Sequence, residues 1–204
     1  MKKYLSTCLI LVFIFFSCGG NVSKNPEDIK NVKTDSIVAT NVLDSIAMIA
    51  NSIDSLRNRG ALFHLDKYAI GKFKGIEVSV EKSSIESKSL TYINLRKDCG
   101  GEYYYSWEDA RIYQKELPSL YSAINSIKDN LGRNVDHEEL IAYTTKDLVT
   151  IKAECKDANK WKIIFSVDLS KSNSYVNLTI DELDKMVDLI KTAEIKLKEI
   201  EATM

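Results

Sequence analysis

Between Asp35 and Asn58 the apolar positions recur at alternating intervals of four and three residues. The residues in this series are Val42, Ile46, Ile49, Ile53 and Leu56. Such spacing puts them in one stripe along an α-helix, with asparagine, serine and aspartate on the other faces. Gly60 suits a helix end, so we predict an N-terminal helix within residues 35–60. The stripe fits either a helix packed on its own domain or a short coiled coil with a second copy or a partner.

After Gly75 the period of the pattern changes to two, which is typical of half-buried strands. Apolar residues alternate with glutamate and serine over Ile76–Glu81. Leu90–Leu95 and Tyr103–Tyr105 are two further strand candidates, and a turn over Asp98–Gly101 separates them. This region therefore predicts three strands.

A helix is expected directly after the third of these strands. Ser106 suits its N-cap, and Glu108 and Asp109 would place negative charge at the positive end of the helix dipole. Pro118 falls inside the predicted helix, so we expect a break or kink just before it. Gly132 suits the end of the helix.

The same order of patterns then recurs towards the C-terminus. Leu148–Ala153, Trp161–Val167 and Tyr175–Leu178 are strand candidates. Thr179 and Glu182 form a capping-box pattern at the start of a strongly amphipathic helix. The second half therefore predicts three strands and a helix once more.

A constant offset of 73 positions aligns the two halves, which are about residues 72–132 and 145–204. It places Val78 opposite Ile151, for example. We therefore predict an α+β domain over residues 61–204, in which two β-β-β-α units form a mostly antiparallel sheet of about six strands. Alternation along the strands implies that one face of the sheet stays wet, so both helices are expected on the other face.

The extreme N-terminus carries a targeting pattern. Two lysines precede the apolar run Leu9–Phe16, which is shorter than the roughly 20 residues that a transmembrane helix needs. Cys18 follows, after the small residue Ser17 and before two glycines. This arrangement resembles the lipobox of bacterial lipoprotein precursors of the Bacteroidetes type, although Phe15 and Phe16 stand where an aliphatic and a small residue are commoner. The alternative is an ordinary secretory signal in which Cys18 has no role.

The resemblance implies that residues 1–17 are a signal peptide and that lipid on the Cys18 thiol holds the protein on a membrane. Residues 18–34 are mostly polar and are expected to form a flexible tether. The residues directly after Cys18 are not acidic. We therefore expect an outer-membrane or cell-surface position in the cell envelope.

Net charge narrows the range of partners. Without residues 1–17 the chain has 26 lysines and arginines against 29 aspartates and glutamates, a formal charge of about −3. A nucleic-acid binder needs clustered positive charge, so no nucleic acid is expected. The predicted partners are the membrane, through the lipid, and an envelope protein or a glycan.

Two cysteines remain beside Cys18 in the predicted mature chain, and they are Cys99 and Cys155. In an oxidising envelope such a pair can form a disulfide. Closing this loop of 56 residues would stabilise the fold by roughly 4 kcal/mol. Two free thiols are the other possibility. A metal site is not expected, because the only histidines, His64 and His137, lack ligand spacing.

The sequence carries no local signature of catalysis. Nucleophile-elbow, zinc-protease, phosphate-loop, EF-hand and dinucleotide patterns are all missing. His64 is expected to be a packed loop residue and His137 to lie in a solvated loop. We therefore predict no catalytic residue and no cofactor, and the protein is more readily explained as a binding or structural module than as an enzyme.

Tyr103, Tyr104, Tyr105 and Trp107 form the one aromatic cluster that stands out. Alternation along a strand sends at least one of the tyrosines to the wet face of the sheet, where exposed aromatic rings can bind ligands. The simpler explanation is that tyrosine favours strands. These four residues are the predicted binding surface.

A strand meander that ends in a helix, present twice, is similar in layout to single-strand nucleic-acid binders of the Whirly and Pur type. This likeness concerns topology alone, and no functional residue is transferred from it. The predicted function is a non-enzymatic envelope lipoprotein that binds a protein or a glycan at the membrane surface. The alternatives are a small envelope hydrolase whose site forms only in the folded protein, and a lipoprotein inhibitor or immunity protein.

Overall fold

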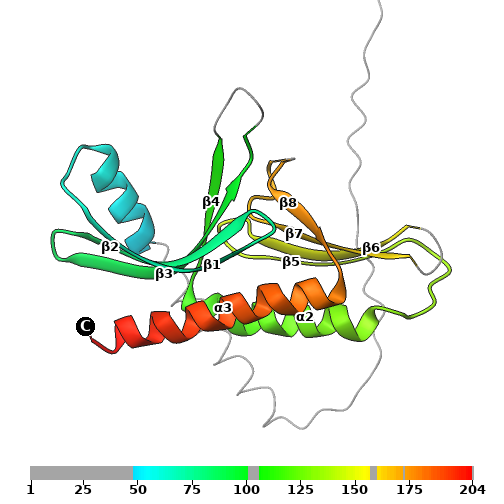
Figure 1. Ribbon diagram of the computed structural model, residues 1–204. Helices are drawn as coiled ribbons and strands as arrows, with labels where there is room; N and C mark the ends of the chain where they lie inside the picture. Colours follow the sequence, from blue (N-terminus) through cyan, green and yellow to red (C-terminus); the bar gives the residue numbers. More distant parts are fainter. Residues whose placement is uncertain (1–47, 101–105, 157–159, 172, 204) are drawn as a thin grey trace, which may run out of the picture. The chain divides into compact units, whose positions relative to one another are not determined.

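The fold is seen in a computed structural model, which describes residues 48–100, 106–156, 160–171 and 173–203. These residues form the α+β fold that the sequence predicts, and their strands are antiparallel (Figure 1). Contacts divide the chain into Met1–Val42 and Leu43–Met204. All elements described below belong to the second unit.

The described elements come in two runs, each of four strands followed by a helix. The first run is β1 (His64–Phe73), β2 (Ile76–Ile85), β3 (Lys88–Asp98), β4 (Trp107–Ile112), the short 3-10 helix η1 (Gln114–Glu116) and α2 (Leu117–Asn130). The second run is β5 (Glu139–Thr144), β6 (Thr150–Cys155), β7 (Trp161–Ser166), β8 (Tyr175–Leu178) and α3 (Ile180–Glu201).

Two four-stranded sheets replace the single six-stranded sheet that the sequence analysis predicts, so that prediction is wrong. The strand order is β1-β2-β3-β4 in the first sheet and β5-β6-β7-β8 in the second, with antiparallel neighbours throughout. The sequence analysis missed β1 and β5. Their residues are all exposed or half-buried, because both strands lie at sheet edges, and this weakens the contrast between their two faces.

The helix predicted from Ser106 does not begin there, because the segment that follows it is strand β4. Ala110 of β4 is buried and pairs with β3. Helix α2 begins later, with Pro118 in its first turn. Proline is tolerated there because the first N–H groups of a helix have no partner within it. Pro118 therefore starts the helix rather than breaking it, and the predicted strand over residues 103–105 lies outside the described residues.

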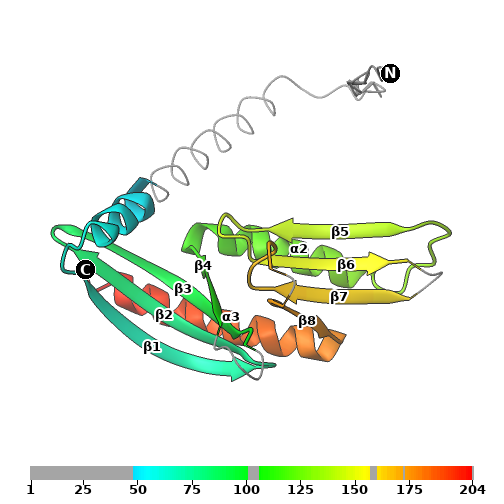
Figure 2. The same ribbon diagram turned by 90° about the horizontal axis from the view of Figure 1, so that it is seen from above.

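An exchange of helices joins the two halves. Helix α3 packs on β1, β2 and β3 of the first sheet, whereas α2 packs on β5 and β6 of the second sheet. The two helices lie side by side beneath the sheets (Figures 1 and 2). Between them, the Tyr121 hydroxyl donates to Glu194 Oε2 at 2.8 Å, and Lys128 pairs with Asp184. One apolar core therefore includes buried residues of both sheets and both helices.

The offset of 73 positions holds for only part of the repeat. Val80, Ile93 and Ile112 pair across successive strands of the first sheet. The equivalent row in the second sheet is Ala153, Ile163 and Leu178. Equivalent residues are 73 positions apart at Val80 but 66 apart at Ile112. The later strands of the second half are joined by shorter connections, so the alignments made beyond β2 are shifted.

The capping box predicted at the start of α3 is confirmed. The backbone N–H of Glu182 donates to Thr179 Oγ1 at 3.3 Å, and the backbone N–H of Thr179 donates to Glu182 Oε2 at 2.9 Å. Lys74, between β1 and β2, places its Nζ 2.8 Å from the same carboxylate. The hydrogen bond from Lys74 lowers the pKa of Glu182. This cap is therefore a second link between the halves.

Residues 48–58 are helical and lie on the face of the first sheet that α3 does not cover (Figure 1). Ala50 and Ile53 are buried. Ala50 belongs to a small cluster, separate from the main core, with Leu90, Tyr92 and Tyr113. Gly60 follows the helix with a φ of 81°. The earlier part of the predicted helix, residues 35–47, lies outside the described residues.

Gly71 provides a test of the helix exchange, because it lies in β1 and faces α3. A β-carbon at this position would lie 2.8 Å from Cδ2 of Leu189. We expect Gly71→Val to lower the free energy of unfolding by about 1–3 kcal/mol, because the added side chain overfills the contact. Denaturant unfolding of Gly71→Val, Leu189→Ala and the double variant measures this effect. The double variant should recover part of the loss, and purely additive losses would contradict direct contact between the two positions.

Candidate functional site

Trp107 is the only residue of the predicted aromatic surface that lies within the described residues. Tyr103, Tyr104 and Tyr105 lie outside them. Trp107 begins β4 and is 37 % exposed. The guanidinium carbon of Arg96 lies 4.7 Å from the centre of its ring, which is a favourable cation–π distance. The described part of the predicted surface is therefore one aromatic ring beside a basic side chain.

The structure holds no disulfide between Cys99 and Cys155, so the possible bond between them is not formed there. Cys99 follows β3 in the first sheet, and its Sγ donates to the carbonyl oxygens of Lys97 and Asn173 at 3.6 and 3.4 Å. Burial raises the pKa of this thiol. Cys155 is buried at the end of β6 in the second sheet. The two thiols thus belong to different sheets and have separate surroundings. Cys18, the predicted lipid site, lies outside the described residues.

The two histidines are surface residues away from the pocket described next. His64 is the first residue of β1 rather than a packed loop residue, and its side chain is 76 % exposed. Its Nε2 lies 2.9 Å from Asp66. His137 lies before β5, with Nδ1 2.9 Å from Asp136. Each imidazole is therefore paired with an aspartate one or two residues away in the sequence.

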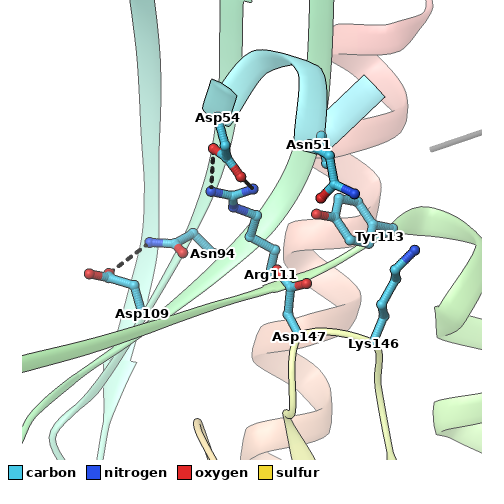
Figure 3. Close-up of a pocket in the computed structure, with 9 residues that line it drawn as sticks. Asn51, Asp54, Asn94, Asp109, Arg111, Tyr113, Lys146 and Asp147 are labelled. Carbon is cyan, nitrogen blue, oxygen red and sulfur yellow. Dashed lines mark hydrogen bonds and ion pairs between the residues drawn. The ribbon is translucent and has the colours of Figure 1, made fainter. Parts of the chain in front are cut away.

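A polar pocket opens on the outer face of the first sheet, opposite the face that packs on α3. Alternation along β4 sends Asp109 and Arg111 outward while Ala110 and Ile112 are buried. The pocket has a volume of about 210 Å³, and we call it the outer-face pocket (Figure 3). Its polar walls are Asn51 and Asp54 of the helix over residues 48–58, Asn94 of β3, Asp109 and Arg111 of β4, Tyr113, and Lys146 and Asp147 between β5 and β6.

Arg111 holds the helix over residues 48–58 to the sheet. Its Nη1 and Nη2 donate to the two carboxylate oxygens of Asp54 at 3.0 and 3.1 Å (Figure 3). Its guanidinium carbon lies 5.2 Å from the centre of the Tyr92 ring. Burial lowers the pKa of Arg111, but hydrogen bonds to Asp54 and Tyr113 outweigh it and the pKa is raised. A bidentate pair of this kind fixes geometry, so Arg111 and Asp54 form the frame of the pocket.

Asn94 lies at the buried side of the pocket and is only 5 % exposed. Its Nδ2 donates to Glu81 Oε1 at 3.2 Å and to Asp109 Oδ1 at 3.3 Å. Glu81 is also buried, and it accepts from the Tyr92 hydroxyl at 3.3 Å and lies 3.4 Å from Lys67 Nζ. Burial and then the charge of Glu81 raise the pKa of Tyr92. This network fixes the orientation of the Asn94 amide.

Buried Glu116 brings the second half of the chain to the pocket. One of its carboxylate oxygens accepts from the backbone N–H of Tyr113 at 3.0 Å, and the other accepts from the backbone N–H of Lys146 at 2.7 Å. Lys146 and Asp147 are thereby placed beside a pocket whose other walls come from the first half. The site therefore exists only when both halves are assembled.

A second polar space of about 300 Å³ adjoins the outer-face pocket and shares Asn94, Asp109 and Arg111 with it. Its other polar walls are Arg57, Lys67, Glu81, Tyr92 and Arg96. Because basic side chains outnumber acidic ones there, we call it the cationic hollow. The shared walls make the pocket and the hollow one groove across β3 and β4.

Asp147 and Tyr113 have altered pKa values. Burial raises the pKa of the Asp147 carboxyl, although the nearby Arg111 lowers it in part. Burial and then the charge of Asp147 raise the pKa of Tyr113. The side chains of Asn51 and Lys146 also line the pocket, and both residues are exposed. These four side chains are placed to exchange hydrogen bonds with a bound molecule.

The walls of the pocket and the hollow consist mainly of acids, amides, tyrosines and basic residues, a set that suits binding of a polar molecule. Their described residues include no serine, cysteine or histidine. Across the described ranges, no group of three His, Cys, Asp or Glu side chains is placed to hold a metal ion. Sequence reasoning missed the outer-face pocket because its residues come from four segments without a shared motif. The one available signal was the polar residue Asn94 within the predicted strand Leu90–Leu95.

None of the helices in the described part of the chain is long and apolar enough to cross a membrane. No protein-family model matches the chain, and no curated protein or solved structure shows significant similarity to it. The likeness in layout to Whirly-type and Pur-type proteins has no counterpart among these comparisons.

The raised pKa of Asp147 predicts a stability change that depends on pH. A carboxyl whose pKa is higher in the folded state destabilises the fold when ionised, and this cost is absent below the unfolded pKa near 3.8. We therefore expect Asp147→Asn to raise the melting temperature at pH 7 and to have little effect at pH 3. Thermal unfolding across this range measures the difference. Asp188→Asn, at an exposed position of α3, is the matched control, and equal pH profiles for the two variants would contradict the prediction.

Proposed function

We propose that the chain is a lipid-anchored protein of the cell envelope whose folded domain binds a small polar ligand in the outer-face pocket. The proposal rests on a difference between two sets of side chains in this pocket, one held by hydrogen bonds within the protein and one that faces the cavity. Arg111, Asp54 and Asn94 are fixed by hydrogen bonds to protein groups. Lys146 and Asp147, by contrast, present charged groups to the cavity (Figure 3). Rigid walls with a few placed polar groups are characteristic of ligand sites.

Binding without catalysis is the activity that these side chains support best. Burial raises the pKa of the Asp147 carboxyl, but a hydrolase needs in addition a partner group that activates water or a nucleophile. The polar end of an envelope peptide or of a glycan has the chemistry to fill the pocket. The ligand proposed for the pocket is thus smaller and more polar than a ligand that would bind the predicted tyrosine surface.

The anchor part of the proposal rests on the lipobox-like pattern at Cys18. Lipid chains on this residue would hold the protein stably on a bilayer, since each buried CH₂ contributes about 0.8 kcal/mol. An outer-membrane or cell-surface position agrees with the lack of acidic residues directly after Cys18. A nucleic-acid ligand is not proposed, because the groove has acidic and basic side chains mixed.

Cys18→Ala tests the anchor. We expect this variant to move from the membrane fraction to the soluble fraction after cell lysis, because the lipid-bearing thiol is gone. Immunoblots of the two fractions measure the shift. Cys99→Ala should fractionate like the unaltered protein. A Cys18→Ala protein that stays with the membrane would show that lipid on this residue is not the anchor.

Ligand binding in the pocket is tested by thermal stabilisation of the full chain in detergent. A ligand that binds only the folded state raises the melting temperature, and the rise grows with the ratio of ligand concentration to Kd. We expect at least one compound from a panel of small sugars, amino acids, peptides and carboxylic acids to stabilise the unaltered protein. The effect should be lost in Lys146→Ala and Asp147→Ala and kept in Lys162→Ala, an exposed residue of β7. Equal stabilisation of all the variants, or of none of the proteins, would overturn the pocket as the ligand site.

A further inference from the structure

The two ends of the groove carry opposite charge. The acidic walls of the outer-face pocket are Asp54, Asp109 and Asp147, against the basic residues Arg111 and Lys146. The basic walls of the cationic hollow are Arg57, Lys67, Arg96 and Arg111, against the acidic residues Glu81 and Asp109. The charge therefore changes sign along one groove.

The basic groups of the hollow differ in how far they are already paired. Arg111 is engaged by both oxygens of Asp54, and Lys67 lies 3.4 Å from Glu81. The guanidinium of Arg57 lies 4.5 Å from the centre of the Phe63 ring and has no carboxylate partner among the described residues. Arg57 is therefore available to bind an anion.

Arg96 adds unused donor capacity at the same end of the groove. Its Nε lies 3.5 Å from Asp109 Oδ1, yet this buried nitrogen makes no hydrogen bond with the described residues. A buried donor without an acceptor is unfavourable unless a bound group or water satisfies it. A guanidinium is also suited to planar carboxylates. The hollow thus has two arginines, Arg57 and Arg96, whose N–H donors are not all paired within the described residues.

The pocket at the other end has unused acceptor capacity. The two hydrogens of Asn94 Nδ2 are used by Glu81 and Asp109, which leaves the carbonyl oxygen of this buried amide without a donor among the described residues. Asp147 is partly buried and makes no ion pair with the described residues, although the charge and a backbone hydrogen bond of Arg111 partly offset the rise in its pKa. Asn94 and Asp147 are therefore acceptors that a cationic donor would satisfy.

We propose that the groove binds a small zwitterion, with its ammonium group in the outer-face pocket and its carboxylate in the cationic hollow. A primary ammonium has three N–H donors and no acceptor, which suits the acceptors of the pocket. A carboxylate suits Arg57 and Arg96. The inference rests on the proposed function and names the class of its ligand. Free amino acids and short peptides with free ends both carry these two groups.

A dipeptide with either end blocked provides the test. The probes are L-alanyl-L-alanine, its N-acetyl form and its C-terminal amide, titrated by calorimetry into the full chain in detergent. We expect each block to weaken binding at least tenfold, because each removes one of the two charges. L-alanine is a fourth probe, and tighter binding of alanine than of the dipeptide would indicate a free amino acid as the source.

Charge variants test the orientation of the ligand. In Arg57→Gln with Arg96→Gln, amidation of the dipeptide should no longer weaken binding, while N-acetylation still does. In Asp147→Asn the reverse is expected. Lys162→Gln and Asp188→Asn, which change charge at exposed positions outside the groove, should behave like the unaltered protein. Melting temperatures of all variants confirm that each one is folded.

Two results would overturn the proposal that the groove binds a zwitterion. One is a blocked dipeptide that binds as tightly as the free one. The other is no binding of any of the four probes while another polar compound still stabilises the protein through Lys146 and Asp147. The second result would leave the proposed function standing and exclude only this class of ligand. Loss of all stabilisation by polar compounds would instead overturn the proposed function as well.

Discussion

Each sheet of this protein has one apolar face, and the structure depends on that face being covered by the helix of the other half. Helix α3 covers the first sheet and α2 covers the second. A lone unit of four strands and a helix would leave its sheet uncovered, since three or more strands are stable only with a packed apolar face. The chain is thus equivalent to a two-subunit assembly joined by residues 131–138.

The outer face of the first sheet follows a different principle, because it is polar and yet largely covered. Glu81 and Asn94 are buried there under the helix over residues 48–58. Burying such groups is unfavourable unless hydrogen bonds replace those to water. The bonds from Tyr92 and Asn94 to Glu81 serve this purpose. The helix is held by few apolar residues and by Asp54, so its contact with the sheet is more polar than the main core.

Sequence patterns predicted the elements whose two faces differ most. The alternation of β2, the capping box of α3 and the α+β class could be predicted, because burial imposes a period on the residues. The edge strands β1 and β5 could not, because exposure on both faces weakens that period. The sequence analysis took Pro118 as a break in a helix, although proline also occurs at helix starts. Strand β4 was missed because its apolar alternation consists of only Ala110 and Ile112, which is too short a pattern to predict a strand.

The groove could not be predicted, since spatial contact and not sequence spacing defines it. Asn94 and Arg111 are opposite each other across β3 and β4, which only the register reveals. Lys146 lies beside them because its backbone N–H donates to the carboxylate of Glu116, which is 30 positions earlier in the chain. The aromatic cluster in the sequence predicted a binding surface at Trp107 and at tyrosines outside the described residues. Trp107 lies on the same face of the first sheet as the groove.

The position of the helix over residues 48–58 has a mechanical consequence. It is the first described element after the proposed tether, so a pull between membrane and domain reaches it before any strand. The Asp54–Arg111 pair links this helix to β4, and both residues are walls of the outer-face pocket. Force on the anchored end would therefore load the wall of the pocket, and a molecule bound there would resist the displacement.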